Sequence, residues 1–235
     1  MSDDLAAREL KALAARKALG FLQNGMLIGL GSGSTASLFN EFLGEALQIG
    51  RLRDIRAVPT SDKTAAQAVK LGIPLVSLTT AEELDLAVDG ADEVDPALNL
   101  IKGLGRALLR EKIIEIHARR FIVIVDESKL VNALGSRVPL PVEIVTFEPQ
   151  AHIRWLNSLG CRAEQWFEET GEPVITDNGN YLVRCWFSPA IPDPHKLAGE
   201  LNNRPGIVEH GLFMDLASEV IVAGTTGVRI LTRPG

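Results

Sequence analysis

Apolar residues follow two different spacings in the first half of the chain. From Leu10 to Leu22 they recur about every 3.6 positions, which predicts an amphipathic helix ended by Asn24-Gly25. The apolar run Met26–Leu30 leads into a glycine-rich turn, and helical spacing returns at Ala36–Leu47. The same order then continues, with apolar runs at 55–58, 75–78, 86–88 and 121–125 and helices that run to residue 71 and over 107–117. Such alternation predicts a mainly parallel sheet with helices on both faces.

The pattern changes after residue 132, where the proline-rich segment SRVPLPVEIV replaces the regular alternation. A helix is predicted near 150–159. Beyond it, the apolar runs Val174–Thr176 and Tyr181–Phe187 flank Asp177-Asn178-Gly179, and a short turn between two such runs predicts a β-hairpin. Strands joined by hairpins are antiparallel, so this part of the chain differs in architecture from the first part.

The remaining segments complete the predicted fold. A helix after Pro194 and a strand at 207–213 finish a small two-layer α+β domain of ferredoxin-like type, and the run 220–231 is expected to rejoin the first sheet. We therefore predict an α/β fold with a mainly parallel, Rossmann-like sheet flanked by helices and a smaller inserted α+β domain. The sequence assigns 1–132 plus 214–235 to the α/β catalytic domain and 133–213 to the inserted domain.

The overall charge excludes some partners. The chain has a formal net charge of −6 and a pI near 5.3, so nucleic-acid phosphates and anionic lipids are repelled rather than attracted. No apolar run approaches the roughly 18 residues of a membrane helix, and the segment MSDDLAAREL lacks a secretory signal pattern. We expect a cytoplasmic protein that binds neither nucleic acid nor membrane, with Cys161 and Cys185 as reduced core thiols.

A glycine-rich loop between the first predicted strand and its helix offers a candidate anion site. In the segment GLGSGSTA, backbone N–H groups and the positive end of the helix point at one spot, where a phosphate would fit. Ser32, Ser34 and Thr35 add hydroxyl donors, and Gly33 has no Cβ to hold the anion away. No lysine follows as in a nucleotide loop, and the third glycine of the dinucleotide fingerprint is missing. A tight turn with a serine cap would give the same pattern.

Three carboxylates follow the apolar run at 86–88. Asp89, Asp92 and Asp95 lie at the sheet edge where open α/β folds bind ligands. A solvated acidic loop or a site for a hard cation would give the same pattern. We expect no metal, because no histidine lies in the cluster and no paired ligand spacing is found among His117, His152, His195 and His210.

Two lysines and a glutamate follow in the next segments. Lys102 precedes a glycine-containing loop, and Glu111 lies inside the following helix on the same face as apolar residues. Burial against apolar neighbours makes a carboxylate a better base, although a surface glutamate in a charged patch is the alternative. Lys129 comes just after the run at 121–125, where it would neutralise a phosphate or pair with Asp126.

Eight segments, in this order and spacing, resemble the type A ribose-5-phosphate isomerase family over nearly the whole chain. They are GSGSTA, TSDKTAAQA, VDGADEVD, IKGLGRALLREKI, VDESK, VPLPVEI, TDNGN and GIVEHGLF. The resemblance implies a homo-oligomer, a homodimer or homotetramer, that interconverts D-ribose 5-phosphate and D-ribulose 5-phosphate through a cis-enediolate. It places the enzyme in the non-oxidative branch of the pentose phosphate pathway and implies neither a metal nor an organic cofactor.

The resemblance also implies roles for particular residues. Glu111 matches the general base, Asp89 is a candidate for assisting ring opening, and Lys102 with nearby backbone N–H groups holds the oxyanion. The residues expected at the phosphate are Ser32, Gly33, Ser34, Thr35, Lys129 and Lys11. The residues expected to line the sugar are Asp89, Gly90, Ala91, Asp92, Lys102, Gly103, Leu104 and Gly105.

Two residues depart from the family pattern. Where the family keeps small residues after the lysine, this chain has Leu104 and Arg106. The side chain of Arg106 would point to solvent, add a phosphate contact or crowd the sugar.

Two other kinds of function fit a fold of this class. One is a non-catalytic sugar-phosphate sensor, although the chain lacks the basic helix-turn-helix segment of a transcription regulator. The other is a different sugar-phosphate isomerase or an amino-sugar deaminase, which would turn over hexose phosphates faster than ribose 5-phosphate.

Overall fold

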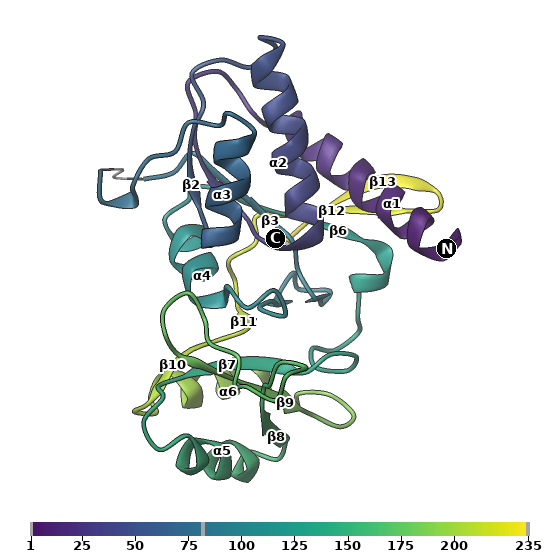
Figure 1. Cartoon of the computed structure of the whole chain (residues 1–235). Coiled ribbons are helices and arrows are strands. Elements are labelled where there is room, and N and C mark those ends of the chain that lie inside the picture. Colours follow the sequence, from purple (N-terminus) through teal and green to yellow (C-terminus); the bar gives the residue numbers. More distant parts are fainter. Residues whose placement is uncertain (1, 81–82, 234–235) are drawn as a thin grey trace. The chain divides into compact units, whose positions relative to one another are not determined.

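The computed structural model describes residues 2–80 and 83–233, with side chains from residue 6 onward. By its contacts the chain divides into two compact units, each assembled from several segments (Figure 1). The first unit contains Met1–Ala91, Arg110–Lys129 and Leu216–Gly235, and the second contains Asp92–Leu109 and Leu130–Asp215. The segment 92–109 therefore groups with the second unit, whereas the sequence pattern places it in the first. The domain boundaries expected from the sequence stay a prediction.

The first unit is built on a six-stranded sheet. Its strands are β1 Leu27–Leu30, β2 Arg56–Pro59, β3 Leu86–Asp89, β6 Phe121–Asp126, β12 Glu219–Gly224 and β13 Gly227–Thr232. They lie in the order β13-β12-β6-β3-β1-β2, and all neighbours are parallel except the β12–β13 hairpin. Strands β1, β3 and β6 are buried along their whole length, as expected of strands covered on both faces.

Helices cover both faces of this sheet. They are α1 Ser2–Leu19, α2 Gly33–Gln48, α3 Asp62–Lys70 and α4 Leu108–Ile116. On one face, α1 and α2 pack against Ile28, Val88 and Ile124 (Figure 1). On the other face, Ile114 of α4 packs against Leu27. Successive residues of β1 are thus buried on opposite sides, because side chains alternate along a strand.

The second unit is built on an antiparallel sheet. Its strands are β7 Leu140–Ile144, β8 Arg162–Gln165, β9 Tyr181–Trp186 and β10 Ile207–His210, in the order β10-β7-β9-β8. Helices α5 Pro149–Ser158 and α6 Pro194–Asn202 pack on one face and bury Val142 and Val183. A small separate sheet in this unit consists of β4 Glu93–Val94, β5 Leu100–Ile101 and β11 Leu212–Phe213.

This architecture confirms the predicted fold class, but three strand predictions were wrong. Residues 75–78 form no strand, since only Leu75 makes a bridge, to Ala57, and a 3-10 helix, η1 Leu78–Thr80, follows. The run 174–176 pairs with the next strand only through a bridge at Ile175. The run 207–213 is split at Gly211, whose N–H donates to Pro141 while β11 joins the small sheet.

Two further expectations concern chemistry and compartment. Cys161 and Cys185 are both free thiols, and Cys185 is fully buried. Among the helices of the described residues, none combines the length and the apolar character that crossing a membrane requires.

Candidate active site

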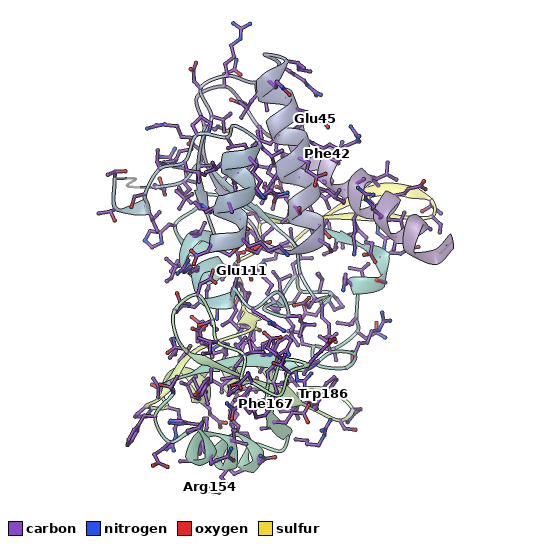
Figure 2. All side chains as sticks on the ribbon, viewed as in Figure 1. Phe42, Glu45, Glu111, Arg154, Phe167 and Trp186 are labelled. Carbon is purple, nitrogen blue, oxygen red and sulfur yellow. The ribbon has the colours of Figure 1, made fainter. Side chains whose placement is uncertain are left out.

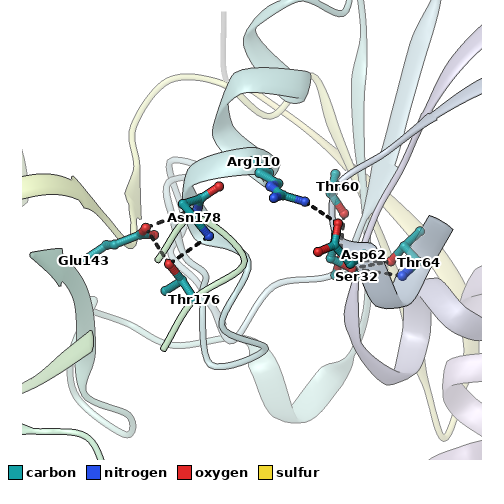
Figure 3. Close-up of polar contacts among 9 residues, drawn as sticks. Ser32, Thr60, Asp62, Thr64, Arg110, Glu143, Thr176 and Asn178 are labelled. Atoms are coloured by element: carbon teal, nitrogen blue, oxygen red, sulfur yellow. Dashed lines mark hydrogen bonds and ion pairs between the residues drawn. The ribbon is translucent and has the colours of Figure 1, made fainter. Parts of the chain in front are cut away.

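Two helices of the first unit begin beside each other, after the neighbouring strands β1 and β2. Ser32 is the N-cap of α2, and Ser61 is the N-cap of α3. The Ser32 hydroxyl lies 2.7 Å from Thr60 Oγ1, 2.9 Å from Ser61 Oγ and 3.0 Å from Thr64 Oγ1 (Figure 3). The positive ends of two helix dipoles therefore meet here, an arrangement that favours a bound anion. We call residues 31–35 and 60–62 the anion cradle.

The part of the cradle at the start of α2 faces open space. Gly33 has a φ of 89°, and no atom lies within 4 Å of the position that its Cβ would take. Ser34 is exposed and Thr35 is half-buried, whereas the Ser32 hydroxyl is occupied by the contacts to α3. Lys11 of α1 donates from Nζ to Ser34 Oγ at 3.1 Å. The predicted phosphate loop thus presents backbone N–H groups, two hydroxyl groups and a lysine.

Asp89 is locked against this loop at the end of β3. Its side chain is 1% exposed, and Oδ1 accepts hydrogen bonds from the N–H groups of Ser32 at 3.0 Å and Gly90 at 2.7 Å. A Cβ atom on Gly31 would lie 2.1 Å from Asp89 Oδ1, so glycine is required at this close approach. Ala91 follows, half-buried, at the boundary of the unit. The phosphate loop and the Asp89 carboxylate are therefore held against each other by a hydrogen bond and close packing.

Glu111 lies in the first turn of α4 and is 3% exposed (Figure 2). Its neighbour Arg110 donates from Nη1 to Asp62 Oδ1 at 2.7 Å (Figure 3), which ties the first turn of α4 to the first turn of α3. Further along α4, Ile114 packs so closely on β1 that a Cβ on Gly29 would lie 2.6 Å from it. Glu111 is therefore carried by a helix that is fixed both to the sheet and to the anion cradle.

Lys129 ends a short 3-10 helix, η2 Glu127–Lys129, directly after β6. Strands β1, β3 and β6 are parallel, so the loops after them leave the same edge of the sheet. Asp126 accepts hydrogen bonds from the backbone N–H and the hydroxyl of Ser128, the first at 2.9 Å. Lys129 is half-buried. It lies at the edge of the sheet that also carries the anion cradle and Asp89.

The second unit holds a separate group of predicted residues. Asp92 Oδ2 accepts a hydrogen bond from the Leu104 N–H at 3.0 Å. Lys102 is 2% exposed, its N–H donates to Gly211 O at 2.9 Å, and its Nζ lies 5.4 Å from the centre of the Phe213 ring. Hydrogen bonds therefore hold Lys102 to Gly211 and, two residues further along the same loop, Leu104 to Asp92.

The loop from Lys102 to Arg106 depends on a left-handed backbone. Gly103 has a φ of 106°, and a Cβ on it would lie 2.8 Å from Leu108 Cβ, whereas Gly105 has open space around that position. Arg106 has a φ of 70°, and its guanidinium donates to both carboxylate oxygens of Glu168. The sequence left open whether this side chain points to solvent, contacts the phosphate or crowds the sugar, and the structure shows instead an ion pair with Glu168 inside the second unit.

Two acidic side chains of the segment VDGADEVD are structural. Asp95 accepts from the N–H groups of Ala97 at 2.9 Å and Asn99 at 2.8 Å, which closes its own loop. Glu93, which sequence reasoning did not single out, is 0% exposed and accepts from three N–H groups of residues 135–138 at 2.5, 2.7 and 3.0 Å. In the part of the chain that the structure describes, no three His, Cys, Asp or Glu side chains are grouped for a metal ion.

Sequence reasoning also missed the hydroxyl groups of Thr60, Ser61 and Thr64 as parts of the cradle. The segment TSDKT predicts a helix cap, because a strand followed by Thr-Ser and a helix repeats the arrangement at Ser32. The pairing of β1 with β2 brings the two caps together. That adjacency is a property of the sheet and cannot be read from either segment alone.

A parallel sheet covered on both faces, with an anion cradle and a buried carboxylate at the carboxyl edge of its strands, defines an α/β enzyme for a small phosphorylated substrate. The model of the family described as ribose 5-phosphate isomerase A (phosphoriboisomerase A) matches residues 56–227. The chain belongs to this family, and it is an isomerase that interconverts ribose 5-phosphate and ribulose 5-phosphate. The predicted activity is thereby confirmed.

Individual relatives match nearly the whole chain. The ribose-5-phosphate isomerase A of Pyrococcus horikoshii is 47% identical over 226 residues, which cover 96% of this chain and 98% of the relative. The probable ribose-5-phosphate isomerase 2 of Arabidopsis thaliana is 47% identical over 232 residues, 97% of this chain and 88% of the relative. A solved D-ribose-5-phosphate isomerase in complex with phospho-erythronic acid has a TM-score of 0.94 at 46% identity, over 97% of this chain and 99% of that chain. The Plasmodium falciparum enzyme has a TM-score of 0.94 at 37% identity, over 97% and 100%.

Proposed function

We propose that Glu111 is the general base of this isomerisation. Its carboxylate takes the proton from C2 of open-chain ribose 5-phosphate, so that the C–H electron pair forms the C1–C2 double bond of a cis-enediolate and O1 becomes negative. The proton then returns to C1, the O2 proton passes to O1, and C2 becomes the carbonyl carbon. The electrons stay within the sugar, so the reaction requires no redox partner.

The surroundings of Glu111 support this role. The side chain is 3% exposed, and a carboxylate shielded from water is a stronger base than one in bulk solvent. The Arg110–Asp62 ion pair connects the start of its helix to the anion cradle. A substrate whose phosphate lies in that cradle would therefore meet the base at a fixed distance, which is a large part of the advantage of a positioned catalytic group. This connection is the observation that carries the proposal.

The anion cradle is the proposed phosphate site. The backbone N–H groups of Gly33 to Thr35 and the hydroxyl groups of Ser34 and Thr35 would donate to the phosphate oxygens. Lys11, which lies at hydrogen-bond distance from Ser34, and Lys129 at the same sheet edge would supply positive charge. Ser32 would act indirectly, because its hydroxyl joins the starts of α2 and α3.

The remaining roles concern the sugar. We assign ring opening to Asp89, and we assign the enediolate oxygen to Lys102 together with backbone N–H groups of the loop Gly103–Gly105. Lys102 is 2% exposed, and a charge shielded from water stabilises a developing oxyanion more strongly than an exposed one. Asp92 would orient this loop through the Leu104 N–H, and the backbone of Gly90 and Ala91 would contact the sugar.

The test of the base is ketose formation from ribose 5-phosphate by Glu111→Gln, with chelator present throughout. We expect kcat to fall by at least about 10²-fold, because a positioned base contributes that much. Glu115→Gln is the matched control, since Glu115 lies one turn further along α4 and is 2% exposed. A Glu111→Gln enzyme with wild-type kcat would contradict the assignment, and loss of wild-type activity in chelator would contradict a metal-free reaction.

We also propose that the enzyme is a cytoplasmic homodimer or homotetramer, as the resemblance to the family implies. Light scattering at micromolar concentration should give two or four times the chain mass of 25.4 kDa. A mass of one chain would contradict the oligomer. Fractionation of the source cells tests the compartment, and recovery in an organelle, like the chloroplastic relative of Arabidopsis thaliana, would contradict it.

A further inference from the structure

Arg106 occupies a backbone position that is unfavourable for a residue with a side chain. Its φ is 70°, in the left-handed region that glycine adopts without strain, and its N–H donates to Gly103 O at 2.9 Å to close the turn. Both neighbouring loop positions, 103 and 105, are glycines. An arginine at this position therefore carries backbone strain that a glycine would avoid, and an interaction of its side chain can offset that strain.

The compensating interaction is a two-point ion pair with an aromatic partner. Nη1 and Nη2 of Arg106 donate to Oε1 and Oε2 of Glu168, the second at 3.0 Å. The guanidinium carbon also lies 5.1 Å from the centre of the Trp166 ring. A bidentate pair fixes orientation as well as distance, and a guanidinium over an indole adds a cation–π attraction. We call Arg106, Trp166 and Glu168 the arginine clamp.

The partners of Arg106 are themselves held by backbone hydrogen bonds. The Trp166 N–H donates to Leu182 O in β9 at 2.8 Å, and the Val174 N–H donates to Trp166 O at 2.9 Å. The Glu168 N–H donates to Glu172 O at 2.8 Å. The clamp therefore attaches the loop after Lys102 to a hairpin that extends from the antiparallel sheet of the same unit.

The loop from Lys102 to Arg106 is consequently held at three places. The Lys102 N–H is bonded to Gly211 O, the Leu104 N–H to Asp92 Oδ2, and the Arg106 side chain to Glu168. We propose that Arg106 is a positioning residue of the isomerase: the arginine clamp fixes the loop that presents Lys102 and its neighbouring N–H groups to the enediolate oxygen. This inference rests on the proposed role of Lys102.

The clamp should affect the chemical step more than substrate binding. Donors aimed at an oxyanion act in the transition state, and small displacements of them reduce the rate strongly. The phosphate is assigned to residues of the first unit, whereas the three residues of the clamp belong to the second unit. We therefore expect Arg106→Gly to lower kcat by about tenfold and to change KM for ribose 5-phosphate by less than about threefold.

The experiment compares Arg106→Gly, Glu168→Gln and the double variant. Glycine removes the clamp and also the left-handed strain, so loss of activity through unfolding is avoided. Because both single changes break the same contact, the double variant should be no slower than either one. Arg106→Lys should recover only part of kcat, since an ammonium cannot form the two-point pair.

Arg162→Ala is the matched control. Arg162 lies on β8, pairs with Glu164 at 2.7 Å and lies 5.7 Å from the Trp186 ring, so it makes the same kinds of contact away from the loop. Its kcat should equal that of the wild type. Unchanged kcat in Arg106→Gly, or a double variant whose loss is the product of the single losses, would overturn the clamp. A lowered melting temperature with unchanged kcat would mean a structural role only and would also overturn it.

Lys102→Met and Lys102→Gln separate the clamp from the function on which it rests. If both keep wild-type kcat, the role of Lys102 is wrong and the clamp has no catalytic group to position. If they lower kcat and Arg106→Gly does not, the proposed function stands and only the clamp is overturned. A lower kcat in Lys102→Met, Lys102→Gln and Arg106→Gly, with wild-type kcat in Arg162→Ala, supports both the role of Lys102 and the clamp.

Discussion

Gly31→Ala should disturb the fold and the site together, because the new methyl group has no room. Its Cβ would lie 2.1 Å from Oδ1, 2.2 Å from Cγ and 2.5 Å from Cβ of Asp89. These atoms include the Cβ of Asp89, which does not move when the carboxylate rotates. A change of rotamer therefore cannot remove the clash. Asp89 is 1% exposed, so either its carboxylate or the loop must move.

The cost follows from the two contacts that such a movement breaks. Overpacking a buried site costs about 1–3 kcal/mol. Asp89 Oδ1 also accepts from the N–H groups of Ser32 and Gly90, and a hydrogen bond to a charged group contributes about 1.5–3 kcal/mol. With one of the two bonds lost, we expect about 3–5 kcal/mol of destabilisation. For a chain of this size the unfolding midpoint should fall by about 10 °C.

The assay is thermal unfolding followed by circular dichroism at one protein concentration, together with kcat for ribose 5-phosphate. Gly199→Ala in α6 is the matched control, because no atom beyond its own helix and chain neighbours lies within 4 Å of its Cβ position. Alanine inside a helix should stabilise the protein by about 0.5–1 kcal/mol. If the midpoint of Gly31→Ala stays within about 2 °C of the wild type, Asp89 is not held against the loop as described, and the reasoning is refuted.

Two further predictions concern other buried groups. Glu93→Ala should destabilise the protein by about 3–5 kcal/mol in urea unfolding, because one buried and two partly buried N–H groups lose their acceptor, and an unchanged midpoint would show that water replaces it. A hydrogen bond with Cys185 lowers the pKa of the Cys161 thiol, and the same bond, together with burial, raises the pKa of Cys185 well above its usual value. Since the thiolate is the reacting form, iodoacetamide at pH 8 should modify Cys161 before Cys185, as read by peptide mass spectrometry, and the reverse order would refute this.

The spacing of apolar residues was sufficient to predict the fold class, because a long helix or strand repeats the same spacing several times. The stripe in the first helix and the apolar runs in β1, β3 and β6 each predict one element. The two-residue strands β4 and β5 were missed, because two residues are too few to show a period. The run 75–78 looked like a strand because it is apolar, but only Leu75 reaches the edge of the sheet, at Ala57.

The candidate residues were located by motif, but their partners were not. Nothing near Glu111 in the sequence indicates that its neighbour Arg110 pairs with Asp62, 48 positions away. The ion pair of Arg106 with Glu168 spans 62 positions and depends on the hairpin that follows β8, a strand that was not predicted. Contacts of this kind depend on which elements are adjacent in three dimensions, and adjacency is not contained in local spacing.

The glycines of the two loops divide into two kinds, and the division bears on where substrate can approach. At Gly31 the missing side chain is replaced by Asp89, and at Gly103 it is replaced by Leu108, so protein atoms already fill both positions. At Gly33 and Gly105 no atom lies within 4 Å of the Cβ position. At the second kind, a substrate atom can come close to the backbone without meeting a side chain. Filled glycines build each loop, and open glycines are the positions at which this isomerase can bring its backbone up to the sugar phosphate.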